Sequence, residues 1–128
     1  MPPARRPTVL IADDDGVIRS LLRLILKEGD YDVVGEALDG ESAVEMCAKQ
    51  KPDLVCLDVM MPKLNGIDAL KAIKAKSPGT VALMVTGDAA TATVKDALQN
   101  GASGYVLKPF NVGKVLDTIE RALKKPGQ

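Results

Sequence analysis

The sequence LVCLDVMMP occupies residues 54–62 and places a carboxylate directly after a short run of apolar residues. Three other short apolar runs also end in polar side chains. They are Val9–Ala12 before Asp13 and Asp14, Val81–Val85 before Thr86, and Tyr105–Leu107 before Lys108. Short apolar runs that alternate with helix-patterned segments are typical of buried parallel strands joined by crossover helices. The sequence therefore predicts an α/β fold.

The polar residues at the ends of these runs are expected to lie at one edge of the sheet. In an open α/β sheet, ligands bind beyond the carboxyl ends of the strands. Asp13, Asp14, Asp58, Thr86 and Lys108 would meet there. Three carboxylates, a hydroxyl and an ammonium group have the chemistry of a site for Mg²⁺ and a phosphoryl group.

The segments between the strands carry helix signals. Asp15, Asp39 and Asn65 are each expected to cap a helix, and Gly29 to end the first one. In the first helix, two ridges are expected to lie on the sheet: Val17, Leu21 and Ile25, and beside them Ile18, Leu22 and Leu26. The fourth helix has a small apolar stripe, formed by Ala90, Val94, Ala97 and Leu98, and is expected to be the most mobile. The last helix, from Val112 onward, is strongly amphipathic.

These signals define a doubly wound, flavodoxin-like fold with a five-stranded parallel sheet in the order 2-1-3-4-5 and five helices. The polar segment Tyr31–Ala37 suits an edge strand. A length of 128 residues fits one domain. We expect an N-terminal extension over residues 1–7, the domain over residues 8–125, and a C-terminal tail over residues 126–128.

Composition narrows the functional classes. The chain has 17 basic and 17 acidic residues, so no overall positive field favours binding to nucleic acid or to a membrane. Neither a secretory signal nor a membrane span is evident, and a cytoplasmic location is expected. Cys47 and Cys56 are expected to be buried, reduced thiols. The chain contains no histidine, which excludes Ser-His-Asp and Cys-His catalysis on its own residues.

An aspartate after a strand is often only the cap of the next helix, but Asp58 is different because Val59–Pro62 leaves no helix for it to cap. Close carboxylates repel by roughly 3 kcal/mol per pair at an effective dielectric near 20. Mg²⁺ would relieve that repulsion, because it binds oxygen ligands in octahedral geometry. Calcium is the competing ion, but the acidic twelve-residue calcium loop is absent and these carboxylates are dispersed along the chain. Lys108 could bind a phosphoryl oxygen or form a plain salt bridge, and both roles could hold in turn.

Four stretches together carry a family resemblance. They are Ile11–Asp15, Leu57–Gly66, Val85–Gly87 and Gly101–Phe110. In this order and spacing the chain resembles the receiver domain of two-component response regulators, and in particular the chemotaxis regulators. The resemblance extends over nearly the whole chain.

The resemblance implies a mechanism. Asp58 would accept a phosphoryl group from a phosphohistidine of a sensor histidine kinase or a phosphotransfer protein. Asp14 would bind Mg²⁺ directly, Asp13 would hold its water ligands, and Asp58 and the backbone carbonyl of Met60 would complete the metal site. Lys108 would stabilise the charge of the transferring group. The protein would promote its own phosphorylation and dephosphorylation without being an enzyme for external substrates.

The resemblance also implies a conformational switch. Thr86 would turn toward the phosphoryl group and Tyr105 would move inward, changing the surface formed by the fourth helix, the fifth strand and the fifth helix for a downstream protein. The alternative for Tyr105 is an ordinary half-buried aromatic side chain. Four residues would flank the pocket: Met60, Gly87, Asp88 and Pro109, the last after a peptide bond that similar proteins hold in the cis form. Met60 and Asp88 stand where related proteins vary and tune the lifetime of the acyl phosphate.

Other functions stay open on the sequence alone. An aspartate-nucleophile phosphatase of small phosphoesters is one, although Met60 stands where such enzymes usually carry a second aspartate. A nucleotide or flavin binder is another, although both glycine-rich nucleotide motifs are absent. The chain could be a single-domain regulator or a receiver cut from a longer regulator with an output domain. The cognate kinase, the stimulus and the oligomeric state are not encoded in any recognisable motif.

Overall fold

In the computed structural model, which describes residues 5–124, strands and helices alternate strictly along the chain. The elements are β1 (Thr8–Ala12), α1 (Gly16–Glu28), β2 (Asp32–Ala37), α2 (Gly40–Gln50), β3 (Leu54–Leu57), α3 (Gly66–Lys76), β4 (Val81–Thr86), α4 (Thr91–Gln99), β5 (Ala102–Leu107) and α5 (Val112–Lys124). The strands are parallel and form one sheet in the order β2-β1-β3-β4-β5. The predicted fold class and strand order are confirmed. The predicted tail over residues 126–128 lies outside the described residues, as do residues 1–4 of the predicted extension.

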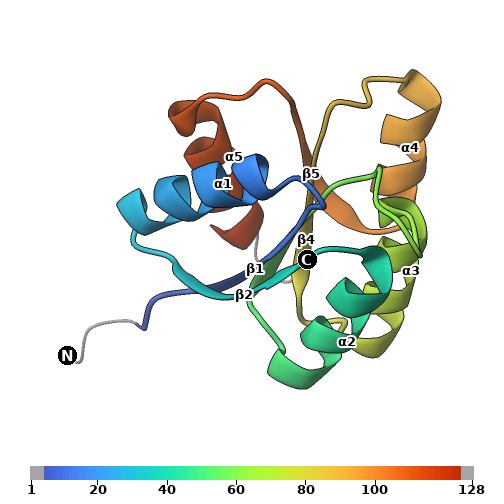
Figure 1. Ribbon diagram of the computed structural model, residues 1–128, viewed down its shortest axis with the longest axis horizontal. Coiled ribbons are helices and arrows are strands. Elements are labelled where there is room, and N and C mark those ends of the chain that lie inside the picture. Colours follow the sequence, from blue (N-terminus) through green and yellow to red (C-terminus); the bar gives the residue numbers. More distant parts are fainter. Residues whose placement is uncertain (1–4, 125–128) are drawn as a thin grey trace.

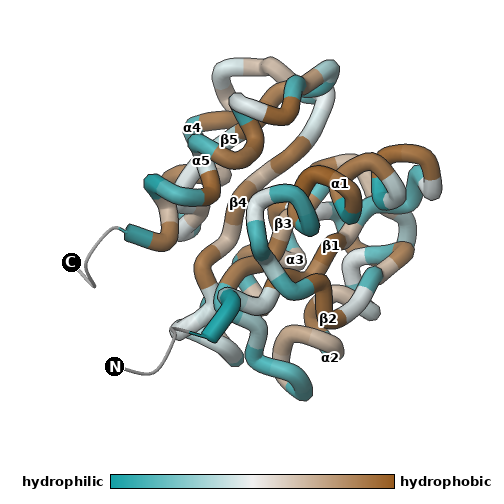
Figure 2. The backbone as a smooth tube through the Cα atoms, turned by 90° about the vertical axis from the view of Figure 1, so that its left-hand side faces the viewer, coloured by the Kyte–Doolittle hydropathy of each residue, from teal (hydrophilic) through white to brown (hydrophobic). Residues whose placement is uncertain are grey.

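The sheet lies between two layers of helices (Figure 1). Helices α1 and α5 cover one face, and α2, α3 and α4 cover the other. Figure 2 shows the hydrophobic residues concentrated along the central strands. Strand β3 is buried on both faces, because Val55 and Leu57 belong to one hydrophobic cluster while Leu54 and Cys56 belong to the other. This double burial explains why β3 has a continuous apolar sequence.

The predicted helix caps are confirmed. The Asp15 carboxylate accepts hydrogen bonds from the first turn of α1, Asp39 accepts one from the Ser42 amide, and Asn65 accepts one from the Asp68 amide. Gly29 ends α1. These caps satisfy amide groups that have no partner within their own helix, so each helix starts directly after the strand-end loop that precedes it.

One prediction for α1 is wrong. In the ridge of Val17, Leu21 and Ile25, only Ile25 lies against the sheet, because 75% of Val17 and 41% of Leu21 are exposed to solvent. Helix α1 packs instead through Leu22, Ile25 and Leu26. A helix that contacts a sheet on one side buries a narrow stripe, and the outer half of a wide apolar face stays in solvent.

The apolar stripe of α4 is also smaller than its sequence pattern indicates. Only Ala97 is buried in this helix, and Leu98 is half exposed. Helix α4 therefore has the weakest hydrophobic attachment of the five helices in the described part of the chain.

Both cysteines lie in the core, on opposite faces of the sheet. Cys47 and Cys56 are buried, and neither forms a disulfide. Burial raises the pKa of each thiol to about 12. As predicted, they are packing residues. Among residues 5–124, no helix combines the length and apolar character needed to cross a membrane.

Asp53 holds the beginning of β1 against the beginning of β3. Its carboxylate accepts hydrogen bonds from the Thr8 amide at 2.7 Å and from the Thr8 hydroxyl at 3.1 Å. It also forms a pair of hydrogen bonds with the guanidinium of Arg5. The bonds from Arg5 and Thr8 outweigh burial and hold the pKa of Asp53 below its ordinary value of 3.8.

We expect Asp53→Ala to lower the free energy of unfolding by about 1–2 kcal/mol at pH 7. Most of this loss should come from the Thr8 bonds, because Arg5 is exposed and an exposed ion pair contributes little. A carboxylate with a lowered pKa stabilises the folded state at pH values above its unfolded pKa, and that contribution is lost as the pH falls. Urea unfolding should therefore show a difference between the two proteins that narrows below pH 3.8. A difference independent of pH would contradict this assignment.

Candidate functional site

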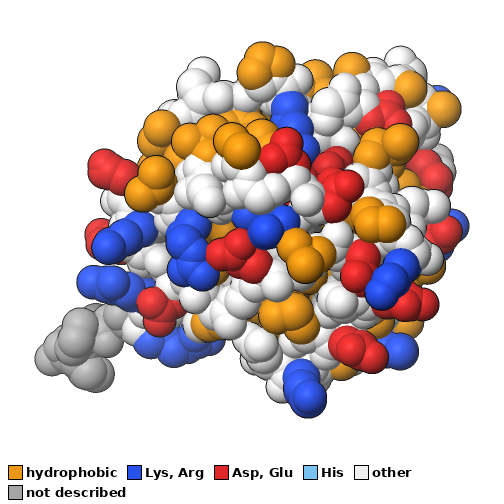
Figure 3. Space-filling view, in the orientation of Figure 1, with side chains coloured by type: hydrophobic (Ala, Val, Ile, Leu, Met, Phe, Trp, Pro, Cys, Tyr) orange, Lys and Arg blue, Asp and Glu red, His pale blue; other side chains and the backbone are white. Residues whose placement is uncertain are grey.

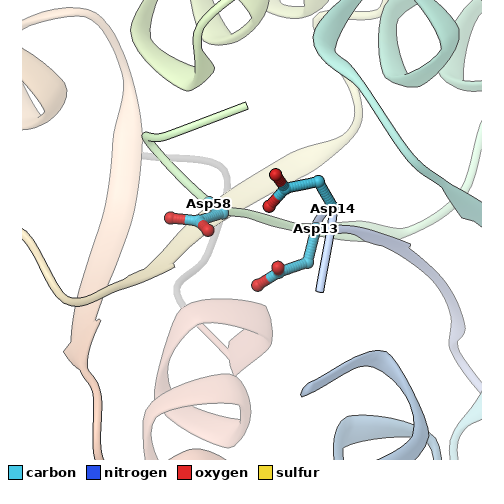
Figure 4. Close-up of side chains that lie close together, drawn as sticks. All are labelled: Asp13, Asp14 and Asp58. Atoms are coloured by element: carbon cyan, nitrogen blue, oxygen red, sulfur yellow. The ribbon is translucent and has the colours of Figure 1, made fainter. Parts of the chain in front are cut away.

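Three carboxylates meet at the carboxyl ends of the central strands. The parallel backbone pairing continues one residue beyond the strands, since the Asp13 amide donates to the Ala37 carbonyl and the Asp58 amide donates to the Ala12 carbonyl. This pairing holds Asp13 and Asp58 side by side, and Asp14 follows in the loop. One oxygen from each of the three carboxylates lies within 4.8 Å of the others (Figure 4). Asp13 and Asp58 are buried, whereas Asp14 is exposed.

Lys108 bridges the two buried carboxylates. Its backbone amide donates to the Thr86 carbonyl, which fixes it directly after β5. Its Nζ donates to Asp13 Oδ2 at 2.8 Å and to Asp58 Oδ2 at 3.1 Å. The sequence allowed Lys108 either a salt bridge or a phosphoryl contact, and this structure contains the salt bridge.

The titration of this cluster reflects burial and charge together. Burial raises the pKa of Asp13 above its ordinary value, even though Lys108 donates a hydrogen bond to it. Burial alone would lower the pKa of Lys108, but its bonds to Asp13 and Asp58 outweigh burial and raise that pKa. Lys108 therefore stays positively charged at neutral pH. One cation faces three carboxylates, so the cluster can accept further positive charge.

The loop after β3 is fixed by two glycines that the sequence analysis did not single out. The Gly66 amide donates to the Val59 carbonyl at 2.8 Å, and a Cβ at Gly66 would overlap the carbonyl of Asp58. A Cβ at Gly40 would overlap the carbonyl of Leu64. The loop from Asp58 to Leu64 is thus held between the first residues of α2 and α3. The sequence does hold a signal for these two positions, because each glycine stands directly after a helix cap. Alanine would otherwise be favoured there by about 1 kcal/mol.

Thr86 and Tyr105 both contact Asp88, the residue that follows Gly87. Thr86 is buried at the end of β4, and its hydroxyl accepts a hydrogen bond from the Asp88 amide at 3.3 Å. Tyr105 is half-buried, and its hydroxyl donates to the Asp88 carbonyl at 2.5 Å. In this structure Tyr105 is therefore turned toward the loop between β4 and α4.

The remaining predicted site residues lie around the cluster. Met60 is 68% exposed, while its amide donates to Asp58 Oδ1 at 3.3 Å. The Lys108-Pro109 peptide bond is cis, as the resemblance suggested, and Pro109 is exposed. A Cβ at Gly87 would meet none of the described atoms within 4 Å, so the space beside this residue is open. The structure thus joins Asp13, Asp14, Asp58 and Lys108 directly and places the other predicted residues around them.

Replacing one carboxylate of the cluster should stabilise the protein when no divalent cation is present. Asp14→Asn removes one of three neighbouring negative charges and keeps the size of the side chain. Because Asp14 is exposed, we expect a gain of only about 1 kcal/mol in the free energy of unfolding, measured by urea titration with a chelator. With added Mg²⁺ the unmodified protein should become the more stable of the two, because it binds the ion more tightly than Asp14→Asn and a bound ligand stabilises the folded state.

Asp32→Asn is the matched control, because Asp32 is an exposed acid at the beginning of β2, outside the cluster. It should leave the free energy of unfolding unchanged with the chelator and with Mg²⁺. Lower stability of Asp14→Asn in the chelator would contradict the proposed repulsion.

Comparisons with known proteins agree with this geometry. The family model of the response regulator receiver domain matches residues 9–120. The chemotaxis protein CheY of Listeria monocytogenes is 38% identical over 116 residues, which cover 91% of this chain and 98% of that protein. The transcriptional regulatory protein PdtaR of Mycobacterium tuberculosis is 40% identical over 117 residues, which cover 91% of this chain and 57% of that protein.

Solved structures show the same likeness. A chain in the crystal structure of the CheX-CheY-BeF₃-Mg²⁺ complex from Borrelia burgdorferi superimposes with a TM-score of 0.89 and is 31% identical. The match covers 92% of this chain and 90% of that chain. The fold, the acidic cluster at the sheet edge and these matches lead to one conclusion. The chain belongs to the family of response regulator receiver domains of two-component systems.

Proposed function

We propose that Asp58 of this receiver domain accepts a phosphoryl group. The observation that supports this most is the contact of Lys108 with both Asp13 and Asp58 inside a cluster of three carboxylates. Asp58 is held by the rigid end of β3, and its two oxygens already have separate partners, Lys108 and the Met60 amide. A nucleophile fixed in this way needs little reorganisation before it reacts.

In the proposed transfer, an oxygen of Asp58 attacks the phosphorus atom of a phosphohistidine. A bond between oxygen and phosphorus forms, and the bond between phosphorus and nitrogen breaks. The electron pair of the broken bond stays on the imidazole nitrogen, and Asp58 becomes an acyl phosphate. The donor histidine lies outside this chain, which contains none. Lys108 then exchanges its contact with Asp58 Oδ2 for an oxygen of the phosphoryl group.

The residues at the site fit a magnesium ion. Asp13, Asp14 and Asp58 present only oxygen ligands, and two of them are held rigidly by the backbone pairing at the sheet edge. Asp14, Asp58 and the backbone carbonyl of Met60 would bind the ion directly, and Asp13 would hold its water ligands. When bound, Mg²⁺ neutralises charge on the transferring group and orients it. The exposed position of Asp14 leaves the site open to exchange of ions with solvent.

We assign the switch to Thr86 and Tyr105. Thr86 would leave the Asp88 amide and donate its hydroxyl to the phosphoryl group, and Tyr105 would respond through the same loop. The open space beside Gly87 gives the phosphoryl group room. Met60, which is exposed at the rim, and Asp88 would tune the lifetime of the acyl phosphate, and Pro109 would flank the pocket.

The signal would leave this domain, which we place at residues 8–125, by protein binding. The donor is a sensor histidine kinase or a phosphotransfer protein, and the downstream protein binds the surface formed by α4, β5 and α5. A groove on that surface is lined by Tyr105, Lys114, Thr118 and Arg121. The Borrelia burgdorferi complex, in which CheY is bound to CheX, supports a protein target of this kind.

We place the protein in the cytoplasm, without direct binding of nucleic acid or membrane. Acidic and basic side chains are interspersed on the face shown in Figure 3, and the net charge is zero. Such a surface gives no continuous positive patch for a phosphate backbone. This chain covers 98% of the Listeria monocytogenes CheY and 57% of PdtaR, so its relatives include a protein of about its own length and a longer one. A receiver within a longer regulator is therefore the alternative to a single-domain regulator.

The test is labelling with acetyl phosphate, a small phosphoryl donor. Intact mass spectrometry should show a gain of one phosphoryl group with Mg²⁺ present and no gain with a chelator. Beryllofluoride, which mimics the acyl phosphate, should change the amide NMR signals near Thr86 and Tyr105 only when Mg²⁺ is present. Equal labelling with and without the metal would refute the proposal.

A further inference from the structure

Arg19, the fourth residue of α1, connects the acidic cluster to the edge strand β2. Its Nη1 donates to the backbone carbonyl of Asp13 at 2.9 Å, and its Nε donates to Glu36 Oε1 at 2.9 Å. Only 18% of the Arg19 side chain is exposed. Because the donors of a guanidinium lie in one rigid plane, the two bonds fix the Asp13 carbonyl relative to Glu36.

Glu36 is itself held firmly. It lies in β2, where its backbone is paired in register with Ile11 of β1. Its Oε2 accepts a hydrogen bond from Arg23 Nε at 2.8 Å. Burial alone would raise the pKa of Glu36, but the hydrogen bonds from Arg23 and Arg19 outweigh burial and hold that pKa below its ordinary value of 4.5. Glu36 therefore stays ionised at neutral pH and gives Arg19 a fixed acceptor.

The two backbone groups of Asp13 reach β2 in different ways. The Asp13 amide donates directly to the Ala37 carbonyl, as the last bond of the parallel pairing between β1 and β2. The Asp13 carbonyl reaches the same strand through the side chains of Arg19 and Glu36. The side-chain bridge therefore continues the attachment to β2 by one peptide group beyond the point where the strands separate.

That peptide group is the one that precedes Asp14. Asp14 is exposed, so packing does little to fix its side chain. A peptide group is planar, so holding the Asp13 carbonyl also places the nitrogen and the Cα of Asp14. The peptide group after Asp14 is held as well, because the Asp15 amide donates to Asp13 Oδ1 at 2.9 Å. With both groups fixed, the Asp14 carboxylate is directed toward Asp58 (Figure 4).

We propose that Arg19 is a positioning residue of the metal site, which holds the peptide group between Asp13 and Asp14 so that the Asp14 carboxylate is placed for a divalent cation. This inference deepens the proposed function and rests on it, because the cation is the Mg²⁺ that phosphoryl transfer would use. Groups that orient metal ligands without touching the metal typically change metal affinity by about 10–100-fold when they are removed.

The positive charge of Arg19 acts in the opposite direction. A cation near the cluster repels a divalent ion, so charge alone predicts that removing Arg19 tightens Mg²⁺ binding. An ordinary ion pair between α1 and β2 would leave the affinity unchanged. Only the positioning role predicts that binding becomes weaker. The sign of the change therefore distinguishes the three roles.

The main test is isothermal titration calorimetry with MgCl₂. Arg19→Met removes the charge and the donors and keeps a long, unbranched side chain, so the dissociation constant for Mg²⁺ should rise about tenfold. Arg23→Met is the matched control, because Arg23 bonds to the same carboxylate but, within residues 5–124, makes no hydrogen bond to the acidic loop. Its dissociation constant should stay within about twofold of that of the unmodified protein. An unchanged or lower value for Arg19→Met would overturn the proposal, as would an equal rise in both variants.

Arg19→Lys separates the hydrogen bond from the charge. Lysine keeps the charge and one donor for the Asp13 carbonyl, but an ammonium group cannot replace the planar fork of arginine. The Mg²⁺ affinity of Arg19→Lys should therefore lie between that of the unmodified protein and that of Arg19→Met. If charge governed the affinity, Arg19→Met would bind the ion more tightly than Arg19→Lys, and this order would overturn the proposal.

A second readout needs no metal. With a chelator present, NMR should show that Arg19→Met moves the carbonyl carbon signal of Asp13 and the amide signals of Asp14, because both belong to the peptide group that has lost its donor. Arg23→Met should leave these signals in place. Unchanged Asp13 and Asp14 signals in Arg19→Met would show that Arg19 does not hold this peptide group.

Labelling by acetyl phosphate separates this inference from the proposed function. In Arg19→Met, the Mg²⁺ concentration that gives half of the maximal labelling rate should rise about tenfold, while the rate at saturating Mg²⁺ should equal that of the unmodified protein. A rate that stays low at saturating Mg²⁺ would overturn a role that acts through the metal. If the unmodified protein gained no phosphoryl group at all, the proposed function would be refuted, and calorimetry and NMR would still decide the role of Arg19.

Discussion

Asp58→Asn should abolish labelling by acetyl phosphate, with an initial rate at least about a thousandfold below that of the unmodified protein. The reason is chemical, since a neutral amide lacks the nucleophilic oxygen of a carboxylate and cannot form an acyl phosphate. The measurement is the time course of mass gain at saturating Mg²⁺. Asp68→Asn is the matched control, because Asp68 is an exposed acid at the beginning of α3, and its labelling rate should be normal.

The fold should survive this substitution, so loss of labelling cannot be attributed to unfolding. Asparagine keeps an oxygen that can accept from the Met60 amide, and Lys108 keeps its shorter bond to Asp13. Removing one charge also relieves repulsion within the cluster. Circular dichroism and urea unfolding should therefore show a native variant. A native Asp58→Asn protein that still gains a phosphoryl group at the normal rate would contradict the assignment.

Gly66→Ala should cost about 3 kcal/mol or more of the free energy of unfolding, or shift the loop that carries the site. The added Cβ would lie 2.7 Å from the Cα of Val59 and would overlap the carbonyl of Asp58. These neighbours are backbone atoms, which cannot move aside by changing a rotamer. The damage should reach Asp58, so the labelling rate should fall together with the stability.

Gly16→Ala provides the matched control. Gly16 also follows a helix cap, but the nearest atom to its added Cβ is the end of the flexible Arg19 side chain at 3.4 Å. Alanine should therefore be neutral there, or stabilising by up to about 1 kcal/mol through its higher helix propensity. If the close approach at Gly66 is correct, urea unfolding should show a large loss in the free energy of unfolding for Gly66→Ala and no loss for Gly16→Ala. Similar small changes in both would show that the contact at Gly66 does not constrain the loop.

The sequence predicted the features that depend on short-range signals. Asp15, Asp39 and Asn65 cap the expected helices because a capping side chain acts on amides two or three residues away. The continuous apolar sequence of β3 placed Asp58 at the centre of the sheet edge for a similar reason. A buried parallel strand needs apolar side chains on both faces.

Features that depend on contacts between distant segments could not be predicted in the same way. Val17 is exposed because another stripe of α1 meets the sheet. The apolar character of valine does not reveal which stripe that is. The need for glycine at positions 40 and 66 arises where two helices meet the loop after β3. The contacts of Asp88 depend on the pairing of β4 with β5 and on the weak attachment of α4.

The most direct test of the central claim is to locate the phosphoryl group on the chain. The protein is labelled with acetyl phosphate and Mg²⁺, reduced with borohydride so that an acyl phosphate becomes homoserine, digested and sequenced by mass spectrometry. The account predicts homoserine at position 58 alone. Homoserine at position 13 or 14 with aspartate retained at 58, or a mass gain that borohydride does not convert, would contradict it.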